Sequence, residues 1–390
     1  MPFDALTRTV PALARALADL PPLQADDVVW PLLRRLLAAP APSGGANLPG
    51  AVGEVIGALA SELGLGARWI REVGTTGNAA VWLGADKPSA GSPADIVVVA
   101  HMDRPSFRVR APERGDLVPI CANRFPEGED RAGARALRFV DGRLVTAARG
   151  VLVSRRVGGQ DTLTFEAVEG TLAWQDTVVL DVEPRRGADG LVTGTGLDNA
   201  LGVLMALLAV AALARVEDAL RGRGARLLVV FSDQEEGPPD AFFGHGAARL
   251  AHTLPPPRGA VVVDAHGAAP ESAPHMGAGV SHATIAGWGR GSIVPPNFHA
   301  LALDLAAGVN AARPGTVQFN TGYLSRSDDL ALGRWAKILA LTGPPMAHAH
   351  TTRETAHLAD LRSGAMWLAY FLAAVLNLAP ELNGRYALGA

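Results

Sequence analysis

The strongest constraint in this sequence is an alternation of short β-branched apolar runs with longer stretches of helical spacing. The run Ile96–Ala100 (IVVVA) is apolar at every position, which is typical of a strand covered on both faces. Four further segments have the same character and predict strands: Ala79–Leu83, Ala225–Phe231, Ala260–Val263 and Ile338–Leu341. Apolar residues three and four positions apart predict helices in six others: Pro11–Leu20, Val28–Ala38, Val52–Leu63, Ala200–Val216, His299–Ala311 and Asp360–Leu376. This alternation predicts an α/β layer with helices on both faces of a sheet.

The stretch from about Arg104 to Val192 has a different pattern of apolar and polar residues. Short alternating segments follow one another between Gly, Pro and Asp turn signals, and no long helical pattern interrupts them. The stretch therefore predicts a compact all-β unit, a barrel or a sandwich, inserted into the α/β unit. We expect the chain of 390 residues to divide into a first catalytic part, the insertion and a second catalytic part: 1–103, 104–193 and 194–390.

Composition narrows the function classes. Lys and Arg number 35 against 38 Asp and Glu, so there is no basic excess for a nucleic acid or an anionic membrane surface. The single cysteine, Cys121, excludes an internal disulfide and a multi-cysteine zinc site, and it fits a reducing cytoplasm. The N-terminus lacks the pattern of a signal peptide, and the apolar stretch Ala200–Ala214 is shorter than the roughly 18 residues of a membrane span. We therefore expect a cytoplasmic protein without a membrane partner.

Side chains that can bind metal follow the predicted strands. In open α/β sheets, active groups gather beyond the carboxyl ends of the strands. The candidates at these strand and helix ends are His101, Asp103, Asp198, Glu235, Glu236, Asp264, His348 and His350. Imidazole and carboxylate form the ligand set of borderline divalent cations such as zinc, cobalt or manganese.

Each candidate also has a purely structural interpretation. His101 could be a hydrogen-bonded core histidine, Asp198 could cap the helix that follows it, and the Glu pair could be solvated. The joint occurrence of these residue types at five independent element ends favours a metal site, because only 19% of the chain is charged.

The residue types also suggest a division of roles. A two-metal site needs a bridging carboxylate, and Asp198 is the best candidate because it stands between the other ligands in chain order. Asp103 could accept the second ring N–H of His101 and so orient it. Of the adjacent Glu235 and Glu236, one would bind metal while the other acts as the general base for a water molecule.

The ordered motifs HMD, LDNALG, QEE, VVVD and HTTRE resemble those of the glutamyl aminopeptidase and tetrahedral (TET) aminopeptidases, family forty-two of the metallopeptidases. The resemblance covers nearly the whole chain. Its most specific feature is the position of the insertion, because that family places a β-rich domain between the His-x-Asp motif and the bridging Asp. Related deacylases and carboxypeptidases place their extra domain after the Glu pair.

This resemblance implies a zinc-peptidase-like mixed sheet flanked by helices and a metal-dependent aminopeptidase that acts on short peptides. It also implies a homo-oligomer, two zinc ions with cobalt or manganese as alternatives, and Glu235 as the base. One metal would take His101, Asp198 and Asp264. The other would take Asp198, Glu236 and His350, because Glu354 follows His350 at the family spacing; His348 remains the alternative ligand.

The sequence departs from the family pattern at two places, and it leaves two alternative functions open. Arg104-Pro105 follows the first motif where the family usually has acidic and small apolar residues, and GPPDAFFGHGA after the Glu pair is longer and richer in proline than usual. These departures bear on substrate preference more than on metal binding. The alternatives are an amidase, deacylase or carboxypeptidase of the same clan, and a non-catalytic assembly protein that retains the fold.

Overall fold

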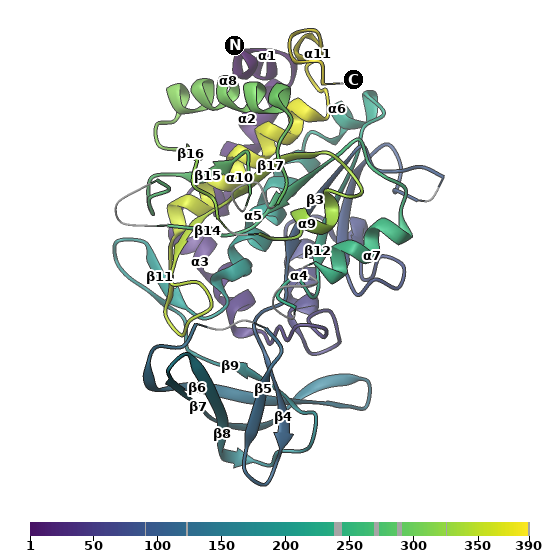
Figure 1. The fold of residues 1–390 in the computed structure, drawn as a ribbon. Helices are drawn as coiled ribbons and strands as arrows, with labels where there is room; N and C mark the ends of the chain where they lie inside the picture. Colours follow the sequence, from purple (N-terminus) through teal and green to yellow (C-terminus); the bar gives the residue numbers. More distant parts are fainter. Residues whose placement is uncertain are drawn as a thin grey trace.

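The computed structural model describes residues 1–89, 91–121, 124–237, 244–268, 273–286, 291–324 and 326–388. A large α/β unit carries a smaller β-barrel at one end, the lower end in Figure 1. The two units have separate hydrophobic cores. The fold class predicted from the sequence, an α/β unit with an inserted all-β domain, is confirmed.

An eight-stranded mixed sheet forms the centre of the large unit. Its strands, in spatial order, are β1 (Trp69–Ile70), β2 (Ala79–Gly84), β12 (Arg226–Ser232), β3 (Ile96–His101), β13 (Gly259–Val263), β17 (Ile338–Gly343), β15 (Val280–Ala283) and β16 (Val317–Asn320). The four strands β12, β3, β13 and β17 run parallel to one another. All six residues of β3 are buried, which explains the unbroken apolar run at its centre.

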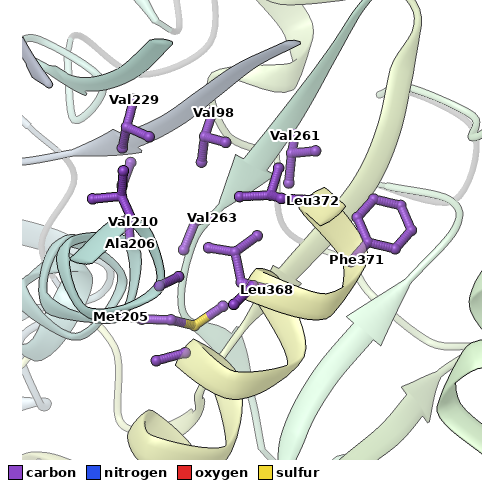
Figure 2. Packing of buried hydrophobic residues seen from close by; sticks show 14 of the residues in the cluster. Val98, Met205, Ala206, Val210, Val229, Val261, Val263, Leu368, Phe371 and Leu372 are labelled. Atoms are coloured by element: carbon purple, nitrogen blue, oxygen red, sulfur yellow. The ribbon is translucent and has the colours of Figure 1, made fainter. Parts of the chain in front are cut away.

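Helices surround this sheet. The α-helices are α1 (Pro2–Thr9), α2 (Pro11–Ala18), α3 (Asp26–Ala38), α4 (Val52–Glu62), α5 (Leu197–Ala214), α6 (Glu217–Gly222), α7 (His245–Thr253), α8 (Pro296–Ala312), α9 (Asp329–Leu332), α10 (Leu358–Val375) and α11 (Glu381–Tyr386). Figure 2 shows α5 and α10 packed side by side on the central strands. Met205 of α5 and Leu368 of α10 meet there beside Val263 of β13.

Two of these helices are apolar and long enough to cross a membrane by length and composition alone. They are α5 and α10, each of 18 residues. Of these residues, 94% are buried inside the protein in α5 and 89% in α10. Their burial against each other and against the sheet identifies them as core helices of the α/β unit.

The inserted unit is a closed barrel. Its strands, in spatial order, are β4 (Phe107–Ala111), β5 (Asp116–Pro119), β8 (Gln160–Gly170), β7 (Arg143–Val157), β6 (Gly128–Val140) and β9 (Thr177–Leu180). Phe107, Leu152 and Phe165 are buried in its own core. Closure leaves the barrel without free strand edges, so a short all-β segment can fold as an insertion.

A five-stranded sheet joins segments that are far apart in the chain. It comprises β10 (Arg185–Arg186), β11 (Leu191–Gly194), β19 (Glu354–His357), β18 (Pro345–Ala347) and β14 (His266–Gly267). Strand β10 and all but the last residue of β11 fall within the expected insertion 104–193, yet both strands pair outside the barrel. We therefore propose that the insertion ends near Leu180, where β9 ends.

We predict that Gly364→Ala destabilises the packing of α10 on α5. A Cβ atom at Gly364 would lie 2.6 Å from Sδ of Met205 and 3.0 Å from Cγ2 of Val280, so neighbouring side chains would have to shift. Overpacking of this kind costs about 1–3 kcal/mol, and the midpoint of thermal unfolding followed by circular dichroism should fall. Gly384→Ala in α11 is the control, because a Cβ atom there meets nothing within 4 Å. It should leave the midpoint unchanged or raise it. Equal midpoints for both variants would contradict the proposed packing constraint.

Candidate metal centre

The parallel strands bring two of the candidate residues, His101 and Asp264, to one edge of the sheet. His101 is the last residue of β3 and lies opposite Ser232, the last residue of β12. Asp264 directly follows β13, the other parallel neighbour of β3. Because the carboxyl ends of parallel strands share an edge, residues far apart in the chain converge there.

His101 lies between two carboxylates. Its Nε2 is 3.2 Å from Oδ1 of Asp198 and 3.3 Å from Oδ1 of Asp264, and all three side chains are largely removed from solvent. Oε2 of Glu235 lies 3.9 Å from the same nitrogen. These polar atoms converge on one small volume, as a metal centre requires.

The carboxylate of Asp198 faces two imidazoles. Oδ1 points to His101, while Oδ2 lies 3.5 Å from Nε2 of His350. Asp198 does not cap helix α5, because Asp198 and Asn199 have non-helical backbone angles and the side chain of Asn199 accepts the N–H of Gly202 at 2.9 Å. Gly196 has a left-handed φ of 77°, and a Cβ atom there would lie 2.2 Å from the side chain of Arg104, so only glycine fits. The two oxygens of the Asp198 carboxylate therefore face two different imidazoles.

His350 completes a second group with Glu236. Its Nε2 lies 3.1 Å from Oε2 of Glu236 and faces the carboxylate of Asp198. His348, the alternative raised by the sequence, is exposed and lines a neighbouring cavity instead. Of the two histidines, it is His350 whose ring joins the carboxylate cluster.

Burial and mutual charge shape the electrostatics of this cluster. Burial raises the pKa of Glu235 well above its usual range, and it likewise raises the pKa of Glu236 and Asp264. Burial alone would lower the pKa of His101, but the carboxylates of Glu235 and Asp264 more than offset it and raise that pKa well above 6.5. Buried carboxylates at such separations repel one another, and divalent cations relieve that repulsion.

The residues present fit divalent metal ions. Oε1 of Glu236 is buried and has no hydrogen-bond partner, as expected of an oxygen reserved for a ligand. Within the described residues, three groups of side chains offer ligand atoms within 4.8 Å of one another: His101, Asp198 and Asp264; Asp198, Glu236 and His350; and His101, Glu235 and Glu236. Nitrogen and carboxylate donors of this kind suit zinc and its neighbours.

Asp103 interacts with the site differently from the sequence expectation. Nδ1 of His101 lies 3.1 Å from the backbone carbonyl oxygen of Asp103 but 3.7 Å from its carboxylate. That carboxylate instead accepts the backbone N–H groups of Glu235 at 3.0 Å and Glu236 at 3.2 Å. The carbonyl is therefore the closer partner of His101, because the side chain is engaged in holding the Glu pair.

Glu354 links the two loops that carry Asp198 and His350. Strands β11 and β19 pair Gly194 with Glu354, which brings these loops together. Oε2 of Glu354 accepts the N–H of Leu197 at 2.7 Å, and Oε1 accepts the N–H of His350 at 3.0 Å. The sequence showed the spacing of Glu354 from His350, but not this role, because it depends on pairing across 160 residues of chain.

Arg104, the first departure from the family pattern, does not line the metal pocket. Its guanidinium donates to the carbonyl oxygens of Leu36, Leu37 and Ala39 and so satisfies the C-terminus of α3. Burial lowers its pKa to about 10. In the second departure, GPPDAFFGHGA, residues 238–243 lie outside the described residues.

The side chains of the cluster open into a cavity of about 330 Å³. Its wall also contains Arg124 from the barrel unit and Arg326 from the loop before α9. The sequence analysis did not single out Arg124, since it lies outside the motifs at the strand ends. Arg124 is remote from every strand of the central sheet in the chain, and only tertiary structure brings it here.

Two features of this structure are typical of metallopeptidases. One is a mixed sheet flanked by helices with an inserted barrel, and the other is a buried imidazole–carboxylate cluster at the carboxyl edge of the parallel strands. The model of the M42 glutamyl aminopeptidase family matches residues 164–366, just over half of the chain. The chain therefore belongs to the M42 glutamyl aminopeptidase family, and it is a hydrolase that acts on peptides. No curated protein matches the chain by sequence.

Solved structures share the fold at low sequence identity. A TET aminopeptidase from the marine sediment archaeon Thaumarchaeota archaeon SCGC AB-539-E09 superposes with a TM-score of 0.69 at 16% identity, covering 91% of this chain and 99% of that one. Aminopeptidase APDkam598 of the archaeon Desulfurococcus kamchatkensis gives 0.65 at 18%, covering 90% and 96%. The Pyrococcus horikoshii TET1 peptidase, which can assemble into a tetrahedron or a large octahedral shell, gives 0.65 at 17%, covering 87% and 97%.

We predict that Glu354→Gln weakens the binding of divalent cations by about 10–100-fold, the usual effect of losing a partner that positions ligands. The amide NH₂ would face one of the backbone N–H groups that the carboxylate accepts, so one of the two loops would move away. Titration with zinc in competition with a chromophoric chelator measures the affinity. Glu62→Gln on α4, whose exposed side chain pairs with Arg35, is the control. An unchanged zinc affinity in Glu354→Gln would contradict the positioning role.

Proposed function

We propose that the protein is a metal-dependent aminopeptidase with a dinuclear site, and that it removes N-terminal residues from short peptides. The observation that carries this proposal is the Asp198 carboxylate, whose two oxygens face His101 and His350 separately. In this proposal His101, Asp198 and Asp264 hold one cation. Asp198, Glu236 and His350 hold the other. Zinc is the proposed metal, with cobalt or manganese as alternatives.

Glu235 is the proposed general base. Its carboxylate is buried, lies 3.9 Å from Nε2 of His101 and lines the same cavity as the proposed ligands. When bound, the cations polarise the scissile carbonyl and lower the pKa of the attacking water from 15.7 to about 7. Glu235 accepts the proton of that water and passes it to the leaving amine. The carboxylate of Asp103 accepts the backbone N–H of Glu235 and so holds Glu235 in place. The backbone carbonyl oxygen of Asp103 orients His101.

We further propose that the chain forms a homo-oligomer and works in a reducing cytoplasm. The TET1 peptidase of similar fold forms closed shells, and a related structure is a dodecamer. Apolar side chains exposed on the barrel unit support self-association, with exposed fractions of 76% at Val168 and 68% at Trp174. The single cysteine is compatible with a reducing compartment.

We predict that Glu235→Gln lowers kcat by at least about a hundredfold while the protein retains its bound metal, because the amide cannot accept the water proton. Steady-state kinetics on a cleaved reporter and elemental analysis of the purified variant check the two parts. Glu169→Gln, at an exposed position of the barrel, should leave both unchanged. Full activity in Glu235→Gln would refute the base assignment, and loss of metal would place Glu235 among the ligands.

The substrate class is tested by comparing twenty aminoacyl reporters with the same reporters carrying a blocked amine, in the presence of zinc, cobalt or manganese. An aminopeptidase should cleave free-amine reporters, lose activity after treatment with a chelator and regain it when metal is restored. Cleavage of N-blocked peptides instead would indicate a deacylase or carboxypeptidase. Fewer than one equivalent of metal, without cleavage after metal addition, would indicate a protein that only retains the fold.

A further inference from the structure

A second, larger cavity adjoins the metal pocket. Its volume is about 550 Å³, within the range of small-ligand sites. Side chains from the barrel unit and from the loop before β19 form its wall, among them Arg124, Phe125, Asp130, His348, Thr351 and Arg353. None of the residues that we propose as metal ligands lines it, so it is distinct from the metal pocket.

Arg124 connects the two cavities. It lines both of them, and its backbone N–H donates to the carbonyl oxygen of His350 at 3.0 Å. The short segment 348–353 forms the partition, with His350 on the side of the metal pocket and Arg353 on the other side. A peptide bond of a substrate bound in the metal pocket would therefore lie next to the second cavity. The guanidinium group of Arg124 lies at the boundary between the two cavities.

The charge of the second cavity favours an anion. Arg124 and Arg353 contribute two guanidinium groups, while Asp130 contributes the only carboxylate among the described lining residues. Neither arginine forms an ion pair with a carboxylate in the part of the chain that the structure describes. Both side chains are exposed to solvent. Planar guanidinium groups without a protein partner bind carboxylates in a bidentate manner.

We propose that this cavity binds a carboxylate of the leaving part of the peptide. The inference rests on the proposed aminopeptidase function, which places the scissile bond in the metal pocket. Successive Cα atoms are about 3.8 Å apart, so the C-terminal carboxylate of a dipeptide or tripeptide lies within one or two residues of that bond. Arg124 stands at that boundary, and Arg353 lines the second cavity but not the metal pocket. The carboxylate comes either from the C-terminus or from an acidic side chain in the leaving part.

Three substrates that share one favoured N-terminal residue distinguish these sources: an aminoacyl-alanine dipeptide, its C-terminal amide, and the corresponding aminoacyl-aspartate amide. In the wild-type protein, kcat/KM for the free dipeptide should exceed that for its amide about tenfold, the effect of one good charge-assisted pair. An equal advantage for the aspartate amide would assign the site to an acidic side chain as well. Equal kcat/KM values for all three would overturn the proposal.

Arg124→Gln and Arg353→Gln should each reduce this advantage to less than about threefold. The measured quantity is the ratio of kcat/KM for the free dipeptide to kcat/KM for its amide within each variant, so a general loss of activity does not imitate this result. The matched control is Arg143→Gln, an exposed arginine of the barrel that lines neither cavity. It should keep the full advantage. Retention of the advantage in both Arg124→Gln and Arg353→Gln would overturn the proposal.

A binding measurement separates failure of this site from failure of the proposed function. N-acetyl-alanine, followed by ligand-observed nuclear magnetic resonance, should bind the wild-type and Arg143→Gln proteins more tightly than N-acetyl-alaninamide does. This difference should disappear in Arg124→Gln and Arg353→Gln. If no peptide is cleaved but this binding pattern is found, the aminopeptidase proposal fails while the carboxylate site stands. The absence of any preference for N-acetyl-alanine would refute the site itself.

Discussion

Mutual repulsion among buried carboxylates is the constraint on which the rest of this structure depends. Glu235, Glu236 and Asp264 lie in one buried cluster around His101, where burial raises the pKa of each of them. A folded chain tolerates such a cluster when carboxyl groups are protonated, when neighbouring imidazoles carry positive charge, or when divalent cations are bound. The unpartnered Oε1 of Glu236 favours bound cations. Stability and function are therefore tied to the same small volume.

Carboxylates outside the cluster give it a fixed geometry. Asp103 accepts the backbone N–H groups of both members of the Glu pair, and Glu354 accepts those of Leu197 and His350. In both cases a buried side chain fixes a loop through its backbone. This arrangement lets residues on loops hold positions as precisely as residues on strands, which a metal centre requires.

The barrel unit contributes to the site as well as to the outer surface. Arg124 lies between β5 and β6, on the part of the insertion that faces the α/β unit, and its backbone bonds to that of His350. The insertion thus forms one wall of the metal pocket and of the neighbouring cavity. Variation in such an insertion can change substrate preference without disturbing the central sheet.

The sequence by itself determined the central strands, the core helices and the residue types at the strand ends. A strand that is buried on both faces requires a continuous apolar run such as Ile96–Ala100, and such a run can be recognised in the sequence without knowledge of the fold. Tertiary structure alone placed His350 rather than His348 beside the carboxylates, gave Glu354 its partners and directed Arg104 toward α3. These outcomes depend on pairing between short strands such as β11 and β19. Each of these strands has four residues, which is too few to show a periodic pattern in the sequence. Their register is set by contacts between segments far apart in the chain, and no local pattern encodes it.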